Sequence, residues 1–356
     1  MSGKVQGDKC SWDYATTVNP KVKTYLESGY TSIEHLCEPF SEDVEDYSQP
    51  LPITFDWSDV LCGRSYKNYR FYLSDKDDFS NGITISTTET SVKIYNLFVN
   101  TKYFWKVVAG EWESGVRFIK TDLTAPRLIK IDGVTNVRDL GGYKVANGSY
   151  INQGLIYRAS NVKKPSGVTA EGLFTAKKIL GIKTEIDLRM ETEGALPGDG
   201  AGKGCFKDGV YYRNCSMDWD YTQDTNSAAI QKLFAILSDK NNYPIIFHCT
   251  AGADRTGFIA YLIDGLLGVK KADLINDYQI SNFAKQTERG RFWNTIAHGY
   301  VKVIDEMKGD NLSEKIFKYL VEVKGVNPEH LYRLISIMTE SKTSFFDFYT
   351  SCEKRN

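Results

Sequence analysis

Ten residues, 248–257, constrain this chain more than any other stretch. They read His-Cys-Thr-Ala-Gly-Ala-Asp-Arg-Thr-Gly, so that Cys249 and Arg255 stand six positions apart around a short loop that contains a glycine. The apolar run 243–247 before them is typical of a buried strand, and the residues from Thr256 onward are apolar nearly all round, as in a buried helix. The sequence therefore predicts a strand, a tight loop and a helix start in succession.

A loop in that position can bind an anion. The backbone N–H groups of residues 250–255 can converge where the helix begins, because unpaired amides and the helix dipole both favour negative charge there. Arg255 adds a planar guanidinium that suits two phosphate oxygens. The same field favours a thiolate, so we expect Cys249 to be a nucleophile at neutral pH. We also expect His248 to orient the loop by hydrogen bonding and Thr256 to donate to the sulfur.

Cys249 has two simpler explanations, which its neighbours do not support. A buried structural thiol leaves the glycine, the arginine and the helix start unexplained. A zinc ligand would need a second Cys or His at ligand spacing nearby. No metal or other cofactor is implied, and the candidate phosphate-binding residues are Thr250, Ala251, Gly252, Ala253, Arg255 and Thr256.

These residues resemble the signature of the protein tyrosine phosphatase superfamily, His-Cys-x5-Arg-Ser/Thr, which is complete here. Further segments resemble its atypical tyrosine and lipid phosphatase branch, namely Asn136–Tyr143, Gly154–Arg158, Leu180–Arg189 and the Asp254-Arg255 pair. The resemblance covers roughly residues 126–345 and implies an α/β phosphatase domain with a central sheet flanked by helices. Many members of the branch carry Lys where this chain has Ala253, and its absence weakens a phosphoinositide interpretation.

A phosphocysteine mechanism needs a proton donor for the departing group, and two stretches offer one. Asp254 lies in the loop itself, and the resemblance favours it. Asp218 lies 31 positions before the nucleophile (249 − 218), a spacing like that of the mobile acid loop in dual-specificity phosphatases. Asp220 shares the same Met-Asp-Trp-Asp-Tyr run. We rank Asp254 first and leave Asp218 and Asp220 open.

A fourth aspartate, Asp187, ends a predicted strand, where an ion pair with Arg189 or Arg158 is the simpler explanation. Arg138 and Arg158 are likewise expected to be structural ion-pair partners near the site. Aromatic residues on nearby loops are candidates for one wall of the substrate cleft, although a core role is their default, and they are Tyr211, Tyr212, Trp219 and Tyr221.

Residues 51–119 have a different sequence pattern, which is typical of a β-sandwich. Short alternating strands are separated by turn residues, and they are predicted at Thr54–Trp57, Tyr69–Leu73, Ile83–Ser86, Ser91–Tyr95, Lys102–Val108 and Gly115–Ile119. Leu97-Phe-Val-Asn-Thr-Lys-Tyr103 resembles the tyrosine-corner motif of fibronectin type III domains, with Val99 in place of the usual Pro. An unrelated half-buried meander is the alternative.

The fold class that follows is multidomain, an all-β sandwich and then an α/β domain. We expect an N-terminal extension at 1–45, a fibronectin III-like sandwich at 46–122, a linker at 123–127 and a phosphatase-like catalytic domain at 128–350. In the catalytic domain, strands near 128–131, 154–158, 183–188 and 243–247 alternate with helices near 168–180, 226–239, 256–268, 272–286, 291–307 and 312–323. Six glycines between 194 and 209 predict a flexible loop there.

The composition fits a soluble protein with sizeable cores, since 42% of the 356 residues are hydrophobic. The balance of 44 basic against 45 acidic residues argues against broad binding to nucleic acid or membrane surfaces. The longest apolar run, 257–269, contains Asp264, so no transmembrane segment is predicted. The N-terminus lacks the apolar core of a signal peptide, which predicts a cytoplasmic protein, or a secreted or cell-surface one if a signal has been removed.

Seven cysteines form neither a metal-binding pattern nor an obvious disulfide framework. A working Cys249 must be a thiol. Cys205 and Cys215 flank a loop and either pair or remain thiols, while Cys10, Cys37 and Cys62 could pair among themselves in an oxidising compartment. The sequence leaves the oligomeric state open.

We interpret the chain as a phosphomonoesterase that acts through a phosphocysteine, most simply a protein tyrosine or dual-specificity phosphatase. Its partners are then phosphorylated proteins, small molecules or lipids. An alternative is a phosphoinositide or inositol-polyphosphate phosphatase, for which the candidate basic residues are Lys163, Lys164, Lys203, Lys207 and Arg213. Another is an inactive phosphate-recognition or adhesion protein, against which the complete set of Cys249, Asp254 and Arg255 argues.

Overall fold

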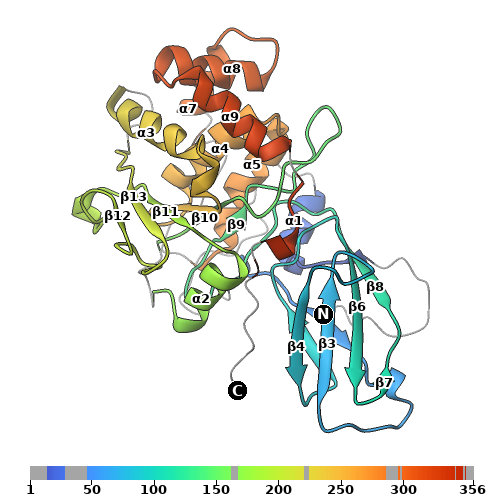
Figure 1. Ribbon diagram of the computed structural model, residues 1–356. Coiled ribbons are helices and arrows are strands. Elements are labelled where there is room, and N and C mark those ends of the chain that lie inside the picture. Colours follow the sequence, from blue (N-terminus) through green and yellow to red (C-terminus); the bar gives the residue numbers. More distant parts are fainter. Residues whose placement is uncertain are drawn as a thin grey trace.

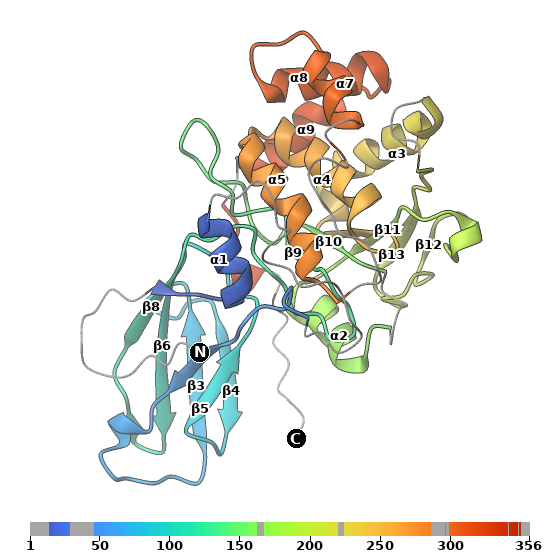
Figure 2. The same cartoon turned by 180° about the vertical axis from the view of Figure 1, so that it is seen from behind.

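The structure is a computed structural model that describes residues 14–28, 46–161, 167–219, 224–285, 296, 299–340, 342–347 and 349. The chain forms an N-terminal part built of two small β-sheets and a C-terminal part in which helices flank a six-stranded sheet (Figure 1). Figure 2 shows from behind that α1 (Pro20–Ser28) lies where the two parts meet. Val22 and Tyr25 of α1 share an apolar cluster with Leu128, Ile280 and Phe283.

All six strands expected in the N-terminal part are present. The strands β2 (Ile53–Asp56) and β5 (Ser91–Ile94) form one antiparallel pair. The larger sheet has the order β1-β8-β6-β3-β4, with β7 paired to β6; its strands are β1 (Tyr14–Ala15), β3 (Tyr69–Ser74), β4 (Ile83–Thr87), β6 (Lys102–Ala109), β7 (Trp112–Glu113) and β8 (Arg117–Thr121). A 3₁₀ turn, η1 (Asp59–Leu61), follows β2.

The two N-terminal sheets share one core that is rich in aromatic rings. Alternate residues of β6 are buried, as expected for a strand with one covered face. Phe55 of β2 contacts Phe71 of β3 and Trp105 of β6, with ring centroids 5.1 and 5.7 Å apart. Tyr103 accepts a hydrogen bond at 2.9 Å from the N–H of Phe98, which ties the turn before β6 to the strand.

The sheet of the C-terminal part has the order β12-β13-β11-β14-β10-β9. Its four central strands run parallel, and the two edge strands are antiparallel. Every residue of β10, β11 and β14 is buried, as expected for parallel strands covered on both faces. The strands are β9 (Arg138–Asp139), β10 (Ile156–Ala159), β11 (Thr184–Asp187), β12 (Gly200–Ala201), β13 (Tyr211–Asn214) and β14 (Ile245–His248).

Helices cover the two faces of this sheet unequally. Ile245 and Phe247 of β14 lie in a large core with residues of α3, α4, α5, α7, α8 and α9, whereas Ile246 faces a smaller core with α2 and its continuation. The helices are α2 (Ala170–Phe174), α3 (Ser227–Leu237), α4 (Asp254–Leu266), α5 (Lys271–Ile280), α7 (Tyr300–Glu306), α8 (Leu312–Lys318) and α9 (Pro328–Thr339). Helix α4 is buried almost completely, which explains why it is apolar nearly all round.

Several sequence expectations for this part need correction. The expected strand at 128–131 forms only isolated bridges, because the chain there turns back on Arg138 and Val134. The expected helix at 168–180 is α2 followed by a π-helical stretch, η2 (Thr175–Ile179), and α8 continues similarly as η7 (Tyr319–Val323). Short 3₁₀ turns complete the set: η3 (Glu191–Glu193), η4 (Asp224–Asn226), η5 (Lys240–Asn242), η6 (Ser281–Phe283) and η8 (Phe345–Asp347). Of the helix expected at 291–307, α7 covers Tyr300–Glu306, while residues 291–295, 297 and 298 lie outside the described residues. Helix α9 was not expected.

The glycine-rich segment 194–209 is folded rather than a free loop. It contains β12, and Asp199 accepts hydrogen bonds from Lys232 at 2.8 Å and from the N–H of Asn214 at 3.0 Å. Phe206 is completely buried in the smaller core. The glycines therefore serve tight turns within a packed segment.

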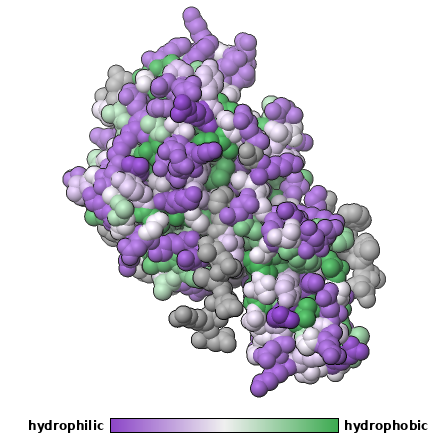
Figure 3. Space-filling view, in the orientation of Figure 1, coloured by the Kyte–Doolittle hydropathy of each residue, from purple (hydrophilic) through white to green (hydrophobic). Residues whose placement is uncertain are grey.

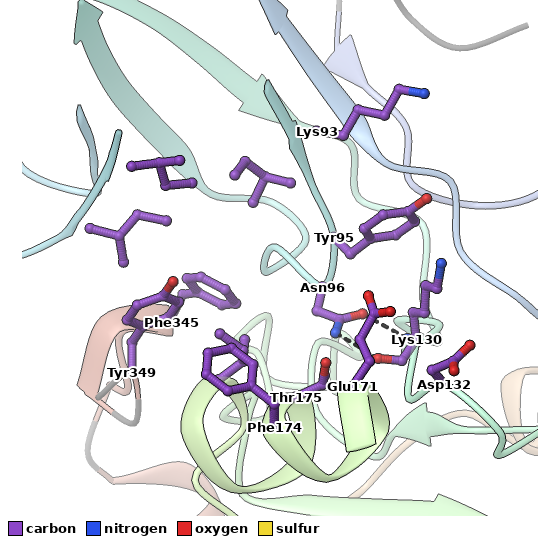
Figure 4. A pocket seen from close by; sticks show the side chains of 14 residues that line it. Lys93, Tyr95, Asn96, Lys130, Asp132, Glu171, Phe174, Thr175, Phe345 and Tyr349 are labelled. Atoms are coloured by element: carbon purple, nitrogen blue, oxygen red, sulfur yellow. Dashed lines mark hydrogen bonds between the residues drawn. The ribbon is translucent and has the colours of Figure 1, made fainter. Parts of the chain in front are cut away.

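The two parts are joined by more than the linker. Phe345 and Phe346, from the end of the chain, complete the aromatic core of the N-terminal part. Gln153 donates to the carbonyl of Val99 and accepts from its N–H, at 3.0 and 2.9 Å. A pocket of about 370 Å³ lies at this junction, where Phe174 of α2 and Phe345 face the same space (Figure 4). None of the described residues that line it is a candidate for catalysis.

The visible surface in Figure 3 is mostly hydrophilic, with scattered apolar residues over both parts. Among the described residues, the most exposed large apolar side chains are Tyr332, Leu123, Val116 and Phe118. No described helix combines the length and the apolar character that crossing a bilayer requires.

Candidate active site

The loop 249–253 joins β14 to α4 at the carboxyl end of the central parallel strands, the edge where α/β folds bind ligands. Gly252 has a φ of +67°, and a Cβ there would lie 2.4 Å from the carbonyl oxygen of Ala159. Only glycine fits this backbone conformation and this close approach to β10. The strand, loop and helix expected from the sequence are all present.

The carbonyl groups of four successive loop residues are bound from outside the loop. The Thr250 carbonyl accepts from the N–H of Asn161 at 2.9 Å. Asn136 Nδ2 donates to the carbonyls of Ala251 and Gly252, at 3.1 and 3.2 Å. Arg158 Nη2 donates to the carbonyl of Gly252 at 2.7 Å, and the N–H of Gly257 donates to that of Ala253 at 2.7 Å.

This pattern fixes the direction of the loop amides. In a trans peptide the C=O and the following N–H point in opposite directions. The carbonyls of residues 250–253 point away from the loop, where they accept their hydrogen bonds. The N–H groups of residues 251–254 therefore point toward the inside of the loop. Together with the start of α4, they form a concave set of donors of the kind that binds a phosphate.

Two buried arginines hold the residues that shape the loop. Arg138 and Arg158 both pair with Asp277 of α5, and Arg138 also donates to Asn136 Oδ1. Burial alone would raise the pKa of Asp277, but the two guanidinium groups keep it below its usual value. The expected ion-pair role of both arginines is confirmed. The sequence did not reveal Asp277, or that Arg158 contacts the loop directly.

Arg255 is completely buried, and Glu193 binds it in a bidentate manner. Its Nη1 and Nη2 atoms donate to the two carboxylate oxygens at 2.5 and 2.6 Å. Nη1 also donates to the carbonyl of Met217 at 3.2 Å, and the ring of Trp219 lies 4.0 Å from the guanidinium carbon. Thr250 donates to the same carboxylate at 3.4 Å. The arginine is therefore oriented from both sides before any phosphate binds.

Glu193 was missed by the sequence analysis, which placed it at the edge of a flexible loop. Hydrogen bonds from Arg255 lower the pKa of its carboxyl, although partial burial opposes this, so it is ionised at neutral pH. One signal was available. β11 and β14 are adjacent and parallel, so acidic residues just after Asp187 lie at the same sheet edge as the loop.

Cys249 is 1% exposed and is the first residue after β14. Thr256 is completely buried in the first turn of α4, and its Oγ1 has no hydrogen-bond partner among the described residues. A buried hydroxyl without a partner is uncommon in a folded protein. It is consistent with the expected contact to the sulfur or to a bound phosphate.

A sequence model described as the tyrosine phosphatase family matches residues 129–353. The chain belongs to this family. A putative tyrosine-protein phosphatase of Cupriavidus necator is 30% identical over 218 residues, which span 55% of this chain and 74% of that protein. A tyrosine-protein phosphatase of Nostoc commune is 31% identical over 123 residues, 29% of this chain and 41% of that protein. The protein is thus an enzyme, a cysteine-dependent phosphatase.

Solved structures show weaker likeness. The core catalytic domain of the PP-IP phosphatase SIW14 from S. cerevisiae, in complex with citrate, aligns with 46% of this chain and 90% of its own, at 20% identity and a TM-score of 0.29. P. aeruginosa TpbA in complex with pTyr aligns with 51% of this chain and 86% of its own, at 14% identity and a TM-score of 0.27. At such TM-scores these structures carry no argument about the site.

In this phosphatase the two described candidates for the proton donor are next in sequence to Arg255 or to residues that contact it. Asp254, the first residue of α4, is half-buried, and Tyr278 donates to its Oδ1 at 3.2 Å. Asp218 is exposed and lies between Met217 and Trp219, both of which contact Arg255. Asp220 and Tyr221 lie outside the described residues. The geometry leaves Asp254 and Asp218 as alternatives.

Asp187 is bound in an ion pair, as the simpler explanation predicted. Arg189 donates to both of its carboxylate oxygens, at 2.9 and 2.6 Å, and the hydroxyl of Tyr212 donates at 3.1 Å. Burial raises the pKa of Asp187, but His248 and Arg189 outweigh burial and lower it. Asp187 is therefore structural, and its partner is Arg189 rather than Arg158.

His248 differs from expectation, because the described contacts of its ring are with β11. Nε2 lies 3.2 Å from Glu185 Oε1, and Nδ1 lies 3.8 Å from Asp187 Oδ1.

Tyr212 is in the core, whereas Tyr211 and Trp219 are 40% and 45% exposed, so only these two of the described aromatics remain candidates for a cleft wall. Cys205, Cys215 and Cys249 form no disulfide with one another.

Proposed function

We propose that this phosphatase hydrolyses phosphate monoesters through a phosphocysteine at Cys249. We further propose that it is a protein tyrosine phosphatase or a dual-specificity phosphatase, so that its substrates are phosphorylated proteins. The observation that carries the proposal is the inward-facing row of loop amides. The direction of these amides follows from the four loop carbonyls that accept hydrogen bonds from outside the loop. In the sequence, the amides lie between Cys249 and the buried Arg255. Such donors stabilise the charge that develops on equatorial phosphate oxygens.

The reaction has two steps. Cys249 Sγ attacks phosphorus in line, so that an S–P bond forms while the P–O bond to the leaving group breaks, and an aspartic acid gives its proton to the departing oxygen. The same carboxylate then accepts a proton from water as the water attacks phosphorus. The S–P bond breaks, and inorganic phosphate leaves. Glu193 contributes by holding the Arg255 guanidinium flat against the incoming oxygens.

Asp254 is our choice for the acid. It begins α4 beside the loop, and the hydroxyl of Tyr278 supports its carboxylate at 3.2 Å. Asp218 remains the alternative because its neighbours Met217 and Trp219 contact Arg255 directly. A role for Asp218 would require residues 217–219 to move with substrate, as a mobile acid loop does.

Phosphotyrosine is favoured over inositol phosphates because two of the basic side chains considered for a polyphosphate site already bind other groups of the protein. Of the residues considered for a polyphosphate site, Arg213 pairs with Asp199 at 3.2 Å, and Lys203 donates to the carbonyl of Gly198. Lys163 and Lys164 lie outside the described residues. The two relatives found by sequence are both called tyrosine-protein phosphatases. The exposed ring of Trp219 is a suitable wall for an aryl phosphate.

The N-terminal part is proposed to be a fibronectin III-like module, with the domain boundaries expected from the sequence at residues 46–122 and 128–350. Its pairing of β2 with β5 against the β8-β6-β3-β4 sheet is typical of such antiparallel sandwiches. The hydrogen bond between Tyr103 and the N–H of Phe98 corresponds to a tyrosine corner. Helix α1 of the N-terminal extension packs on the catalytic part.

A substrate panel tests the proposal. The full chain is assayed with a phosphotyrosine peptide, a phosphoserine peptide, phosphatidylinositol phosphates and inositol polyphosphates. We expect the highest kcat/KM on phosphotyrosine, with Cys249→Ser as the inactive control that still binds vanadate. Higher kcat/KM on an inositol phosphate would replace the proposed substrate class. Turnover of Cys249→Ser above about one per cent of the parent would reject the mechanism itself.

A further inference from the structure

Residues 46–49 precede the first long strand of the N-terminal part, β2, but they are bound to the C-terminal part. The N–H of Ser48 donates to the carbonyl of Phe283 in η6 at 3.1 Å. Gln49 Nε2 donates to the carbonyl of Val134 at 3.3 Å. The segment therefore joins the turn after α5 to the stretch of chain that leads into β9.

Ser48 is completely buried, and its hydroxyl is bound on two sides. Its Oγ donates to Asp46 Oδ1 at 2.6 Å and accepts from the backbone N–H of Asn136 at 3.1 Å. The N–H of Ser48 also donates to Asp46 Oδ1, at 3.0 Å. The carboxylate thus takes the hydroxyl proton, and because an amide can only donate, a lone pair of the hydroxyl is directed at Asn136.

Asn136 connects this contact to the loop 249–253. It is completely buried, and its φ of +56° lies in the left-handed region that residues other than glycine seldom adopt. From this conformation its Nδ2 donates to the carbonyls of Ala251 and Gly252, at 3.1 and 3.2 Å. A buried N–H without an acceptor is costly. Ser48 supplies the acceptor for the backbone N–H of Asn136 and so stabilises the conformation from which Asn136 reaches the loop.

We propose that Ser48 is a positioning residue for the loop and that it acts through Asn136. This inference rests on the proposed role of the loop amides. The carbonyls that Asn136 binds fix the direction of the N–H groups of Gly252 and Ala253, which stabilise the equatorial oxygens of the transition state. A segment outside the catalytic sheet thereby contributes to the rate without contacting substrate.

The test uses a second turn of the same kind, which lies in the N-terminal part. The N–H and hydroxyl of Ser58 donate to Asp56 Oδ1 at 2.9 and 2.7 Å, but Ser58 is exposed. Ser48→Ala and Ser58→Ala are compared in the full chain, with para-nitrophenyl phosphate as the substrate.

Ser48→Ala should lower kcat and vanadate affinity together, each by about tenfold. This loss is smaller than the roughly 10²–10³-fold cost of removing a donor outright, because the amides are misdirected rather than absent. Hydrogen exchange of the peptide that contains residues 249–257 should also become faster. Ser58→Ala should stay within about twofold of the parent in kcat and vanadate affinity, as is usual for an exposed substitution.

Asp46→Ala is a second variant, which keeps the serine hydroxyl but removes the acceptor that directs it. It should show the same parallel loss, by about threefold, as expected for one hydrogen bond, and Asp56→Ala is its control. Each kcat is measured below the melting transition of its variant. A lower melting temperature with unchanged kcat and vanadate affinity would make Ser48 a purely structural residue and overturn the inference. That result leaves the proposed function intact, since the proposed function fails only if Cys249→Ser retains turnover.

Discussion

The two parts of the molecule bury different kinds of side chain. The N-terminal core consists largely of rings, such as Trp57 stacked on Phe71 at an interplanar angle of 14°. The C-terminal part buries Arg138, Arg158 and Arg255, and each binds particular carboxylates or carbonyls. Ring packing stabilises a shape without specifying where any one polar atom points. Buried ion pairs and hydrogen bonds do specify it, because every unpaired group is costly.

The comparison predicts where function can be separated from stability. Substitutions in the aromatic core should lower the free energy of unfolding and leave the chemistry of the folded molecule alone. Substitutions among the buried charges near the loop should change rates more than their effect on stability would suggest.

The largest expected effect comes from the proton donor. Asp254→Asn should lose roughly 10²–10⁴-fold in kcat on a phosphotyrosine peptide, as is typical for a lost general acid, and far less on para-nitrophenyl phosphate, whose leaving group hardly needs a proton. The alkaline limb of its pH–rate profile should also disappear. Asp218→Asn is measured in parallel. If Asp218→Asn shows the dependence on leaving group and Asp254→Asn does not, Asp254 organises the loop and residues 217–219 carry the acid.

Arg255→Lys should cost more than tenfold in both kcat and vanadate affinity, because lysine keeps the charge but loses the bidentate contact. Lysine also cannot occupy both oxygens of Glu193 as the guanidinium does. The matched control is Arg117→Lys, since Arg117 stacks on Trp105 in the aromatic part. Equal kinetics in the two variants would mean that Arg255 is structural.

Trp57→Ala should lower the free energy of unfolding by about 3–5 kcal/mol, the usual cost of removing a large buried ring. Trp57 is completely buried between Tyr69 and Phe71. At a temperature where the variant is folded, its kcat should lie within about twofold of the parent. A folded variant with tenfold lower kcat would contradict the claim that the aromatic core affects only stability, and it would show that the aromatic part helps to build the site.

The smallest effect concerns Asp264 of α4, a buried carboxyl whose pKa is raised well above its usual range by burial and by the nearby Asp277. A group with a raised folded pKa stabilises the protein at low pH and loses that contribution as pH rises through the folded value. Asn mimics the protonated acid. Asp264→Asn should therefore melt a few degrees above the parent at about pH 8 and close to it at about pH 4. The exposed Asp310→Asn is the control, and a lower melting temperature of Asp264→Asn at both pH values would refute the assignment.

The sequence predicted those features that depend on local patterns. The loop between β14 and α4 was evident from a glycine, an arginine and an apolar helix within ten residues, and alternating strands marked the N-terminal sheets. The features that it missed depend on contacts between residues far apart in the chain. Arg255 meets Glu193 from 62 positions away, and Arg158 meets Asp277 from 119. Nothing local to Asp277 distinguishes it from other acidic residues. Glu193 is marked only by its place soon after β11, and the pairing of β11 with β14 is itself a contact between distant segments.

The contacts made by the last described residues were missed for a related reason. The end of the chain looked like part of the catalytic domain, yet Phe345 and Phe346 pack into the aromatic core of the other part. Two aromatic residues near a terminus carry no signal for which core they enter. Likewise, the glycines of 194–209 predict flexibility by their number alone, whereas in the structure Gly204 permits a close approach of the backbone to Glu185.

Trapping the covalent intermediate tests the central claim most directly, namely that the loop presents Cys249 to phosphorus. The full chain is mixed with a phosphotyrosine peptide, quenched in acid within the first turnover, digested and examined by mass spectrometry. The account predicts a phosphoryl group on the peptide that contains Cys249. In Asp254→Asn the phosphorylated fraction should be larger than in the parent when para-nitrophenyl phosphate is the substrate, because that leaving group hardly needs the acid whereas the attacking water still needs the base. A phosphoryl group on another residue, or steady turnover with no phosphorylated peptide at any quench time, would contradict it.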